Sequence, residues 1–184
     1  MKIILIGLQG SGKSTQGNIL SEEFNLPYLS SGHIFRDIAK GKSKFSRYIK
    51  EVLNAGYLVP DDIAFEIVTK YLRKKEYRKG FILDGFPRTL KQAKNLDQKI
   101  DKVINFNISE DTALHRLGLR MEKENREDDT NNAIKKRMEI FFKFTEPVID
   151  YYRKEKKLID IDGERPVEEI KEYLFKSLKE ENDK

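Results

Sequence analysis

Residues 2–21 read KIILIGLQGSGKSTQGNILS, and this stretch decides the expected fold. Its apolar start leads directly into the octet at residues 7–14, which has the pattern G-x-x-x-x-G-K-[ST] of a phosphate-binding loop. Apolar residues at helical spacing follow, at Ile19, Leu20 and Phe24. Glycines let such a loop curl with its N–H groups pointing inward, and the next helix adds the positive end of its dipole. The stretch therefore predicts a strand, a loop and a helix that bind a nucleoside triphosphate.

The side chains of the octet have the chemistry that polyphosphate binding needs. Lys13 supplies a full positive charge for the terminal phosphates, and the hydroxyl of Ser14 or Thr15 can face a Mg²⁺ ion. We expect the triphosphate to contact the loop at Gly10, Ser11, Gly12, Lys13, Ser14 and Thr15.

Composition places the chain in a broad class. It has 184 residues, 38% hydrophobic and 36% charged, which suits one α/β domain with a core and a charged surface. The net charge of +5 suits a polyanionic ligand. We nevertheless expect no nucleic-acid partner, because the lysines alternate with 31 acidic residues and no nucleic-acid-reading module is recognisable.

The sequence also predicts where the chain acts. It contains no cysteine, which excludes disulfides and thiolate zinc sites and favours a reducing cytoplasm. No apolar run approaches the roughly 18 residues of a membrane span, so we expect no membrane partner. We expect no signal peptide, because the first strand begins next to Met1. We also expect a monomer.

Short apolar strands alternate with helical patterns along the chain. We expect helices that include one from Ser43 to Asn54, one capped by Asp61, one capped by Ser109, and a last one that starts at Pro166. A long helix before the last strand should kink at Pro147. Strands are predicted at residues 3–6, 26–30, 81–84, 103–108 and 158–161.

This alternation predicts an α/β fold: a P-loop, doubly wound, five-stranded parallel sheet covered by helices on both faces. Two insertions interrupt it, a small helical one at residues 31–59 and a short polar lid loop at 119–129. Ligands should lie outside the carboxyl ends of the strands, where the phosphate loop lies.

Residues beyond the loop could complete a site for phosphoryl transfer. Asp84 ends a buried strand, where an acidic group near the metal is expected. Arginine suits the clamping of phosphates, because its fork donates two parallel hydrogen bonds and keeps its charge. Arg88 is well placed, since Gly85 and Pro87 hold it on a turn just past that strand. The other candidates are Arg36, Arg116, Arg120, Arg126 and Arg137.

Five ordered motifs resemble the adenylate kinase family of nucleoside monophosphate kinases, and the match covers nearly the whole chain. The first is the phosphate loop itself. The second and third are LSSGHIFR at residues 29–36 and AGYLVPD at 55–61. The fourth is the signature GFILDGFPRT at 80–89 with Gln92, and the fifth is DGERPV at 162–167.

The resemblance implies reversible, Mg²⁺-dependent, in-line phosphoryl transfer, in which ATP and AMP give two ADP. It implies a core at residues 1–30, 60–118 and 130–184, an AMP-binding insertion at 31–59 and a short lid at 119–129. The metal would be Mg²⁺ near Asp84, through water, with no zinc. The implied catalytic residues are Lys13, Arg88, Arg120, Arg126 and Arg137.

The resemblance also implies two sets of nucleotide contacts, for the small-molecule partners ATP, AMP and ADP. The ATP set adds Arg116, Arg120 and Arg165 to the phosphate loop. The AMP set comprises Ser31, Gly32, Arg36, Tyr57, Leu58, Val59, Gly85, Arg88, Gln92, Arg126 and Arg137.

The chain departs from the family pattern at two places. His33 stands where the family has Asp, and inter-domain coupling or pH dependence could differ there. The lid is too short for a β-rich domain, so water exclusion should come from a closing loop and from the insertion folding in.

Three other functions are compatible with a phosphate loop. A UMP/CMP or broad-specificity monophosphate kinase is the nearest, but Ser31, Thr89 and Gln92 favour AMP, because the pyrimidine relatives usually carry Ala and an FPRN motif. A nucleotide-dependent switch would not need a second phosphate clamp at Arg36 and Arg88. A sugar or shikimate kinase would lack the FPRT run with its Gln92.

Overall fold

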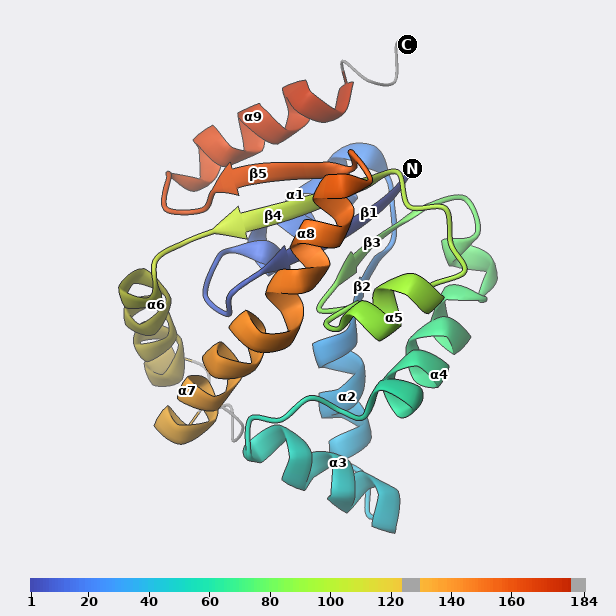
Figure 1. Cartoon of the computed structure of the whole chain (residues 1–184), viewed down its shortest axis with the longest axis vertical. Helices are drawn as coiled ribbons and strands as arrows, with labels where there is room; N and C mark the ends of the chain where they lie inside the picture. Colours follow the sequence, from blue (N-terminus) through green and yellow to red (C-terminus); the bar gives the residue numbers. More distant parts are fainter. Residues whose placement is uncertain (124–129, 180–184) are drawn as a thin grey trace.

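A computed structural model of the chain describes residues 1–123 and 130–179 (Figure 1). The described residues form one five-stranded sheet in the order β2-β3-β1-β4-β5, and every neighbouring pair is parallel. The fold class predicted from the sequence is therefore confirmed. The strands are β1 (Lys2–Gly7), β2 (Tyr28–Ser30), β3 (Phe81–Asp84), β4 (Lys102–Asn107) and β5 (Leu158–Asp162).

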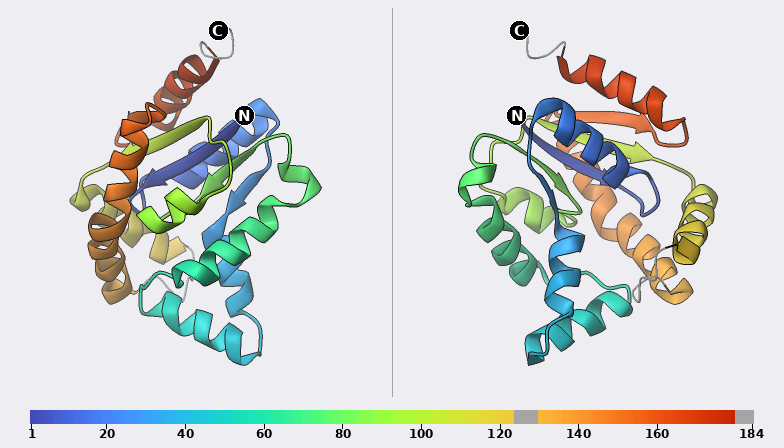
Figure 2. Two further views of the ribbon diagram at one scale, coloured as in Figure 1. Left: turned by 45° about the vertical axis from the view of Figure 1, so that its right-hand side comes forward. Right: turned by 180° about the vertical axis from the view of Figure 1, so that it is seen from behind.

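Helices connect the strands and cover both faces of the sheet (Figure 2). In the first half of the chain they are α1 (Lys13–Phe24), α2 (Ser31–Ala39), α3 (Lys44–Asn54), α4 (Asp61–Leu72), the 3₁₀ turn η1 (Lys75–Tyr77) and α5 (Leu90–Asn95). In the second half they are α6 (Glu110–Lys123), α7 (Asn131–Ile140), the π-helical turn η2 (Phe141–Thr145), α8 (Glu146–Lys154) and α9 (Val167–Lys179).

Side-chain alternation along the strands builds a separate core on each face. Ile3 and Leu5 of β1 pack with Leu20 of α1 and Leu174 of α9 on one face. Residues of opposite parity, such as Ile4, pack on the other face with α4, α5 and α8. Because both faces are covered, the central strands are apolar along most of their length, which is why they were recognisable in the sequence.

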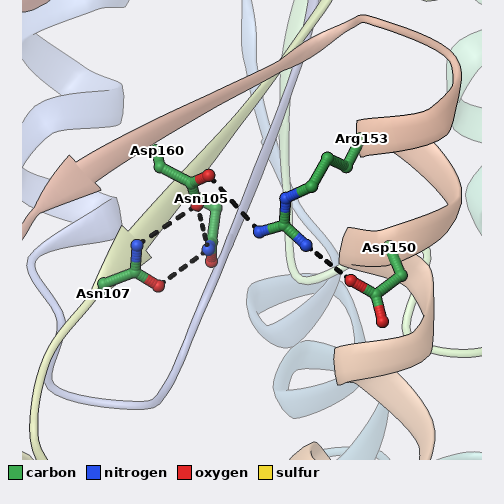
Figure 3. Close-up of polar contacts among 5 residues, drawn as sticks. All are labelled: Asn105, Asn107, Asp150, Arg153 and Asp160. Atoms are coloured by element: carbon green, nitrogen blue, oxygen red, sulfur yellow. Dashed lines mark hydrogen bonds and ion pairs between the residues drawn. The ribbon is translucent and has the colours of Figure 1, made fainter.

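The sheet is polar where β4 and β5 face α8 (Figure 3). Asn105 is paired in register with Asp160 and donates to it at 2.8 Å. Asn107 donates to the same carboxylate, and Arg153 of α8 joins Asp160 to Asp150. Partial burial would raise the pKa of Asp160, but these hydrogen bonds and the Arg153 charge hold it below its ordinary value. Arg153 thus ties α8 to β5 through ion pairs between exposed side chains.

Helices α2 and α3 lie in the stretch predicted to be an insertion, and they extend beyond the carboxyl edge of the sheet (Figure 1). The two helices pack against each other. Val59, which follows α3, is buried in the same hydrophobic core as residues of α4. The arrangement suits a small unit over the carboxyl ends of the strands. Its boundaries as a domain, and those of the lid, remain predictions.

Three local predictions need correction. The irregularity expected at Pro147 lies just before it, in η2, where the N–H of Glu146 donates to Phe141 five residues back. Pro147 has no N–H to continue the normal helical pattern, and the wider turn precedes it. Asp61 is the first residue of α4 rather than its cap, because its carboxylate accepts hydrogen bonds from α5. Helix α9 begins one residue after Pro166.

No helix within residues 1–123 and 130–179 combines the length and the apolar character that crossing a membrane requires.

Candidate active site

The phosphate loop runs between the end of β1 and the start of α1 (Figure 1). Gly10 and Gly12 have φ angles of +81° and +88°, in the left-handed region where a side chain would be strained. Lys13 folds back into the loop, and its Nζ lies 2.9 Å from the Gly7 carbonyl and 2.7 Å from the Leu8 carbonyl. The loop thus curls around the ammonium group that is predicted to meet the terminal phosphates.

The electrostatic surroundings of Lys13 are mostly unfavourable to its charge. Burial lowers the pKa of Lys13 to about 8, and the carboxylate of Asp84 opposes this shift. The positive charges of Arg88 and Arg120 lower the pKa further, which places both guanidinium groups within electrostatic reach of Lys13. An anion in the loop would relieve this accumulation of positive charge.

Asp84 ends β3 beside the loop and is only 5% exposed. Its Oδ2 accepts a hydrogen bond from the Ser14 hydroxyl at 3.2 Å and from the Tyr28 hydroxyl at 2.6 Å. Burial, then the charge of Asp84, raise the pKa of Tyr28 well above its ordinary value, so this phenol stays a neutral donor. Of the two hydroxyls predicted to face the metal, it is that of Ser14 which lies against the carboxylate.

A hydroxyl beside a carboxylate fits a magnesium site, because Mg²⁺ prefers oxygen ligands and keeps several waters. In the described ranges, no group of three or more His, Cys, Asp or Glu residues could hold a metal alone.

A cavity of about 580 Å³ lies between the sheet edge, α2 and the turn that follows α3. Among its other lining groups are the apolar residues Phe35, Ala64 and Phe86, which could contact a base. All of the predicted acceptor residues that the structure describes line this one cavity: Ser31, Gly32, Arg36, Tyr57, Leu58, Val59, Gly85, Arg88, Gln92 and Arg137. Arg126, the remaining member of that set, lies outside the described residues.

A second cavity of about 440 Å³ adjoins the phosphate loop and is lined by Lys13 and Met138. The two cavities have four lining residues in common: Gln9, Gly85, Arg88 and Arg137. The Arg88 guanidinium lies at this junction, and its Nε donates to the Gly85 carbonyl at 2.9 Å. Burial lowers the pKa of Arg88, Asp84 opposes this, and the charges of Arg137 and Arg36 lower it further. Two phosphate-bearing ligands could therefore meet at a shared positive charge.

Gln92 lines the acceptor cavity, is buried, and makes hydrogen bonds that the sequence did not reveal. Its Oε1 accepts from the Arg88 N–H at 2.7 Å, and its Nε2 donates to Asp61 at 2.8 Å. Thr89 donates to the other oxygen of Asp61 at 3.0 Å. The Gln92 amide still has one donor hydrogen and one acceptor lone pair for a ligand, because an amide can make four hydrogen bonds.

The other predicted arginines lie in different places. Arg137 of α7 donates to the Leu53 carbonyl at 3.0 Å and contacts Gln9 of the loop at 3.5 Å. Arg116 of α6 links the loop to the turn before α9, through the carbonyls of Gly10 and Gly163.

Of the predicted ATP residues, all of which the structure describes, Lys13 is the one that lines the loop cavity, and Arg165 lies in a different groove. Its Nε pairs with Asp162 at 3.4 Å, and it lines a separate groove with Tyr173 on the outer side of β5.

Three residues at the site were missed by sequence reasoning. Tyr28 contacts Asp84, Asp61 holds Gln92 and Thr89, and Gln9 lines both cavities. Gln9 was visible within the loop motif, but its position there is one that the motif leaves undefined. Asp61 was visible as the last residue of the AGYLVPD motif, but nothing in the sequence shows its contacts with Thr89 and Gln92. No local pattern marks Tyr28.

Comparisons with known proteins show the family of the chain. The sequence profile of the family described as "Adenylate kinase" matches residues 5–157. The chain belongs to the adenylate kinase family. The predicted family, enzyme class and adenylate kinase function are thereby confirmed, and the enzyme is a nucleoside monophosphate kinase, a phosphotransferase.

Several curated adenylate kinases resemble the chain over most of its length. That of Cyanothece sp. is 37% identical, covering 92% of this chain and 90% of the relative. That of Corynebacterium urealyticum is 36% identical over 185 aligned residues, which cover 97% of this chain and 99% of the relative. That of Caldicellulosiruptor bescii is 35% identical, with the same two coverages, over 212 aligned residues. This last alignment is longer than the chain, so that relative contains residues with no counterpart here.

Proposed function

We propose that this adenylate kinase transfers the γ-phosphoryl group of Mg²⁺·ATP reversibly to AMP, giving two ADP, by direct in-line attack. The observation that carries the proposal is the pair of adjoining cavities with Arg88 at their junction. One cavity has the phosphate loop for a donor, and the other has an apolar base pocket and further arginines for an acceptor. Phosphoryl transfer needs this positioning and charge neutralisation more than covalent help.

The residues of the chain would divide the work by position. The loop amides and Lys13 would hold the β and γ phosphates, while Arg36 and Arg88 would hold the acceptor phosphate. Arg120, Arg126 and Arg137 would add charge around the phosphoryl group in transit. Bound Mg²⁺, near Ser14 and Asp84, would neutralise the donor phosphates.

The choice of AMP rests on the amide of Gln92. It can donate and accept at once, which matches the edge of adenine, and Phe35 and Phe86 offer apolar contact to the ring. A coupled assay should compare AMP, CMP, UMP and GMP as acceptors with Mg²⁺·ATP. A clear preference for AMP is expected. A preference for CMP or UMP would instead support the alternative pyrimidine or broad-specificity kinase.

We also propose a short-lid, monomeric, cytoplasmic enzyme. The short lid rests on the polar stretch at residues 119–129, which is too short for a β-rich domain. Light scattering after gel filtration would test the monomer, for which a mass near 21.6 kDa is expected.

A further inference from the structure

Tyr28 begins β2 and points its hydroxyl at the carboxylate that ends the neighbouring strand β3. The strands pair in parallel with Tyr28 opposite Ile82 and Ser30 opposite Asp84. The ring is long enough to reach along the sheet, and its hydroxyl lies 2.6 Å from Oδ2 of Asp84. The Ser14 hydroxyl contacts the same oxygen. Two donors on Oδ2 fix the carboxylate and leave Oδ1 as the oxygen that can face a metal-bound water.

Gly17 of α1 makes the room that this ring needs. A Cβ at Gly17 would lie 2.5 Å from Cε2 of Tyr28 and 2.9 Å from Cδ1 of Leu5, distances that require atoms to move. Glycine inside a helix destabilises it by about 1 kcal/mol relative to alanine, so the position carries a cost in the helix itself. The close approach of the Tyr28 ring gives a physical reason for a glycine there.

We propose that Tyr28 is a positioning residue, which aims the carboxylate of Asp84 at hydrated Mg²⁺ and depends on Gly17 for its own placement. Hydrogen-bond donors behind a metal-binding carboxylate fix its orientation, and their removal typically weakens metal affinity about tenfold or more. The inference rests on the proposed use of Mg²⁺·ATP. A role in stability alone is the alternative, because a buried carboxylate needs hydrogen-bond partners in any case.

Titration calorimetry without AMP separates the two roles, because no reaction occurs without an acceptor. The Kd of ATP is measured once with Mg²⁺ and once with EDTA. For Tyr28→Phe we expect a Kd for Mg²⁺·ATP about tenfold higher than in the wild type, with metal-free ATP unchanged within twofold. Equal changes in both values, or no change in either, would overturn the positioning role.

Two further variants keep the test decisive if Tyr28→Phe is unstable. Gly17→Ala should displace the ring and reproduce the selective loss for Mg²⁺·ATP. The double variant Gly17→Ala/Tyr28→Phe should be no weaker than either single one, since both act through one contact. Additive losses would contradict this. Tyr77→Phe is the matched control. It also removes a hydroxyl from a buried tyrosine, which is 8% exposed, but Tyr77 lies before the start of β3, at the end of the strand opposite Asp84.

Failure of the proposed reaction would be recognised separately. A wild-type chain that binds Mg²⁺·ATP but does not phosphorylate AMP would refute the proposed function, and the ratio of the two Kd values would still report on Tyr28.

Discussion

The backbone N–H of Arg88 donates to Oε1 of Gln92 at 2.7 Å, so the predicted phosphate clamp and the predicted base contact share one hydrogen bond. Both residues follow the same strand, β3. Arg88 lies on the turn after it, where its Nε donates to the Gly85 carbonyl, and Gln92 lies in α5, where its amide donates to Asp61. The acceptor's phosphate and base would therefore be positioned by one rigid unit.

Replacing Arg88 should affect turnover far more than donor binding. Arg88→Ala removes a half-buried charge from the junction of the two cavities, and we expect kcat to fall at least about a hundredfold. The Kd of ATP should stay within a few-fold, because the loop and Lys13 are intact. Steady-state kinetics and ATP titration check this, with Arg73→Ala, an exposed arginine beyond α4, as the control. Near-wild-type turnover would refute the clamp.

Asp61 should act on the acceptor without touching the donor site. Asp61→Ala leaves the Thr89 hydroxyl and the Gln92 amide without their shared partner, so Gln92 loses its fixed orientation. We expect the KM for AMP to rise about tenfold, and stability to fall by about 1–3 kcal/mol. The KM for ATP should not change. Asp62→Ala, an exposed neighbour, is the matched control, and equal changes in both KM values would contradict this role.

The pKa of Lys13 predicts a dependence of stability on pH. Burial lowers that pKa from 10.5 to about 8, so between these values the unfolded chain binds a proton that the folded chain has lost. The free energy of unfolding of the wild type, taken relative to that of Lys13→Met, should therefore rise with pH between about 8 and 10.5. Below about pH 8 the difference between the two proteins should be constant. Urea unfolding at pH 7, 8, 9 and 10 measures this. A difference that stays constant to pH 10 would contradict the lowered pKa.

Activity should have the opposite pH dependence. Deprotonation of Lys13 in the nucleotide-free enzyme removes the charge that meets the phosphates, so kcat/KM for ATP should fall above about pH 8. Lys13→Arg provides the comparison, because arginine keeps its charge, and its residual activity should stay level over pH 7–9.5. A parallel fall in both proteins would assign the titration to another group.

Removal of metal should stop turnover without unfolding the protein. EDTA is expected to abolish phosphoryl transfer, because Mg²⁺ supports the phosphates rather than the fold. The unfolding temperature should not change, since the sequence has no cysteine and we predict no structural zinc. Differential scanning calorimetry with and without EDTA checks this, and a large drop would indicate a structural metal.

Much of the fold was predictable from the sequence, because its signals are local. The phosphate loop and the buried strand that ends at Asp84 can each be recognised from composition and spacing within about ten residues. Together they indicate the strands around which the sheet is built. The acceptor residues were found through the family resemblance, and the structure places the described ones around one cavity.

Contacts between distant residues could not be predicted in this way. Tyr28 and Asp84 are 56 residues apart and meet only because β2 and β3 pair in one particular register. Asp61 looked like a helix cap, since the sequence does not show that α5 competes for its carboxylate. Arg165 matches a family segment, yet its guanidinium pairs with Asp162 in another groove.

Binding of a bisubstrate dinucleoside pentaphosphate tests the two adjoining cavities most directly. Diadenosine pentaphosphate spans a donor and an acceptor site joined by their phosphates, so calorimetry should give one molecule per chain and a Kd at least about a hundredfold below that of ATP. Arg88→Ala should remove most of this advantage. A pentaphosphate that binds no more tightly than ATP would contradict a paired site for phosphoryl transfer.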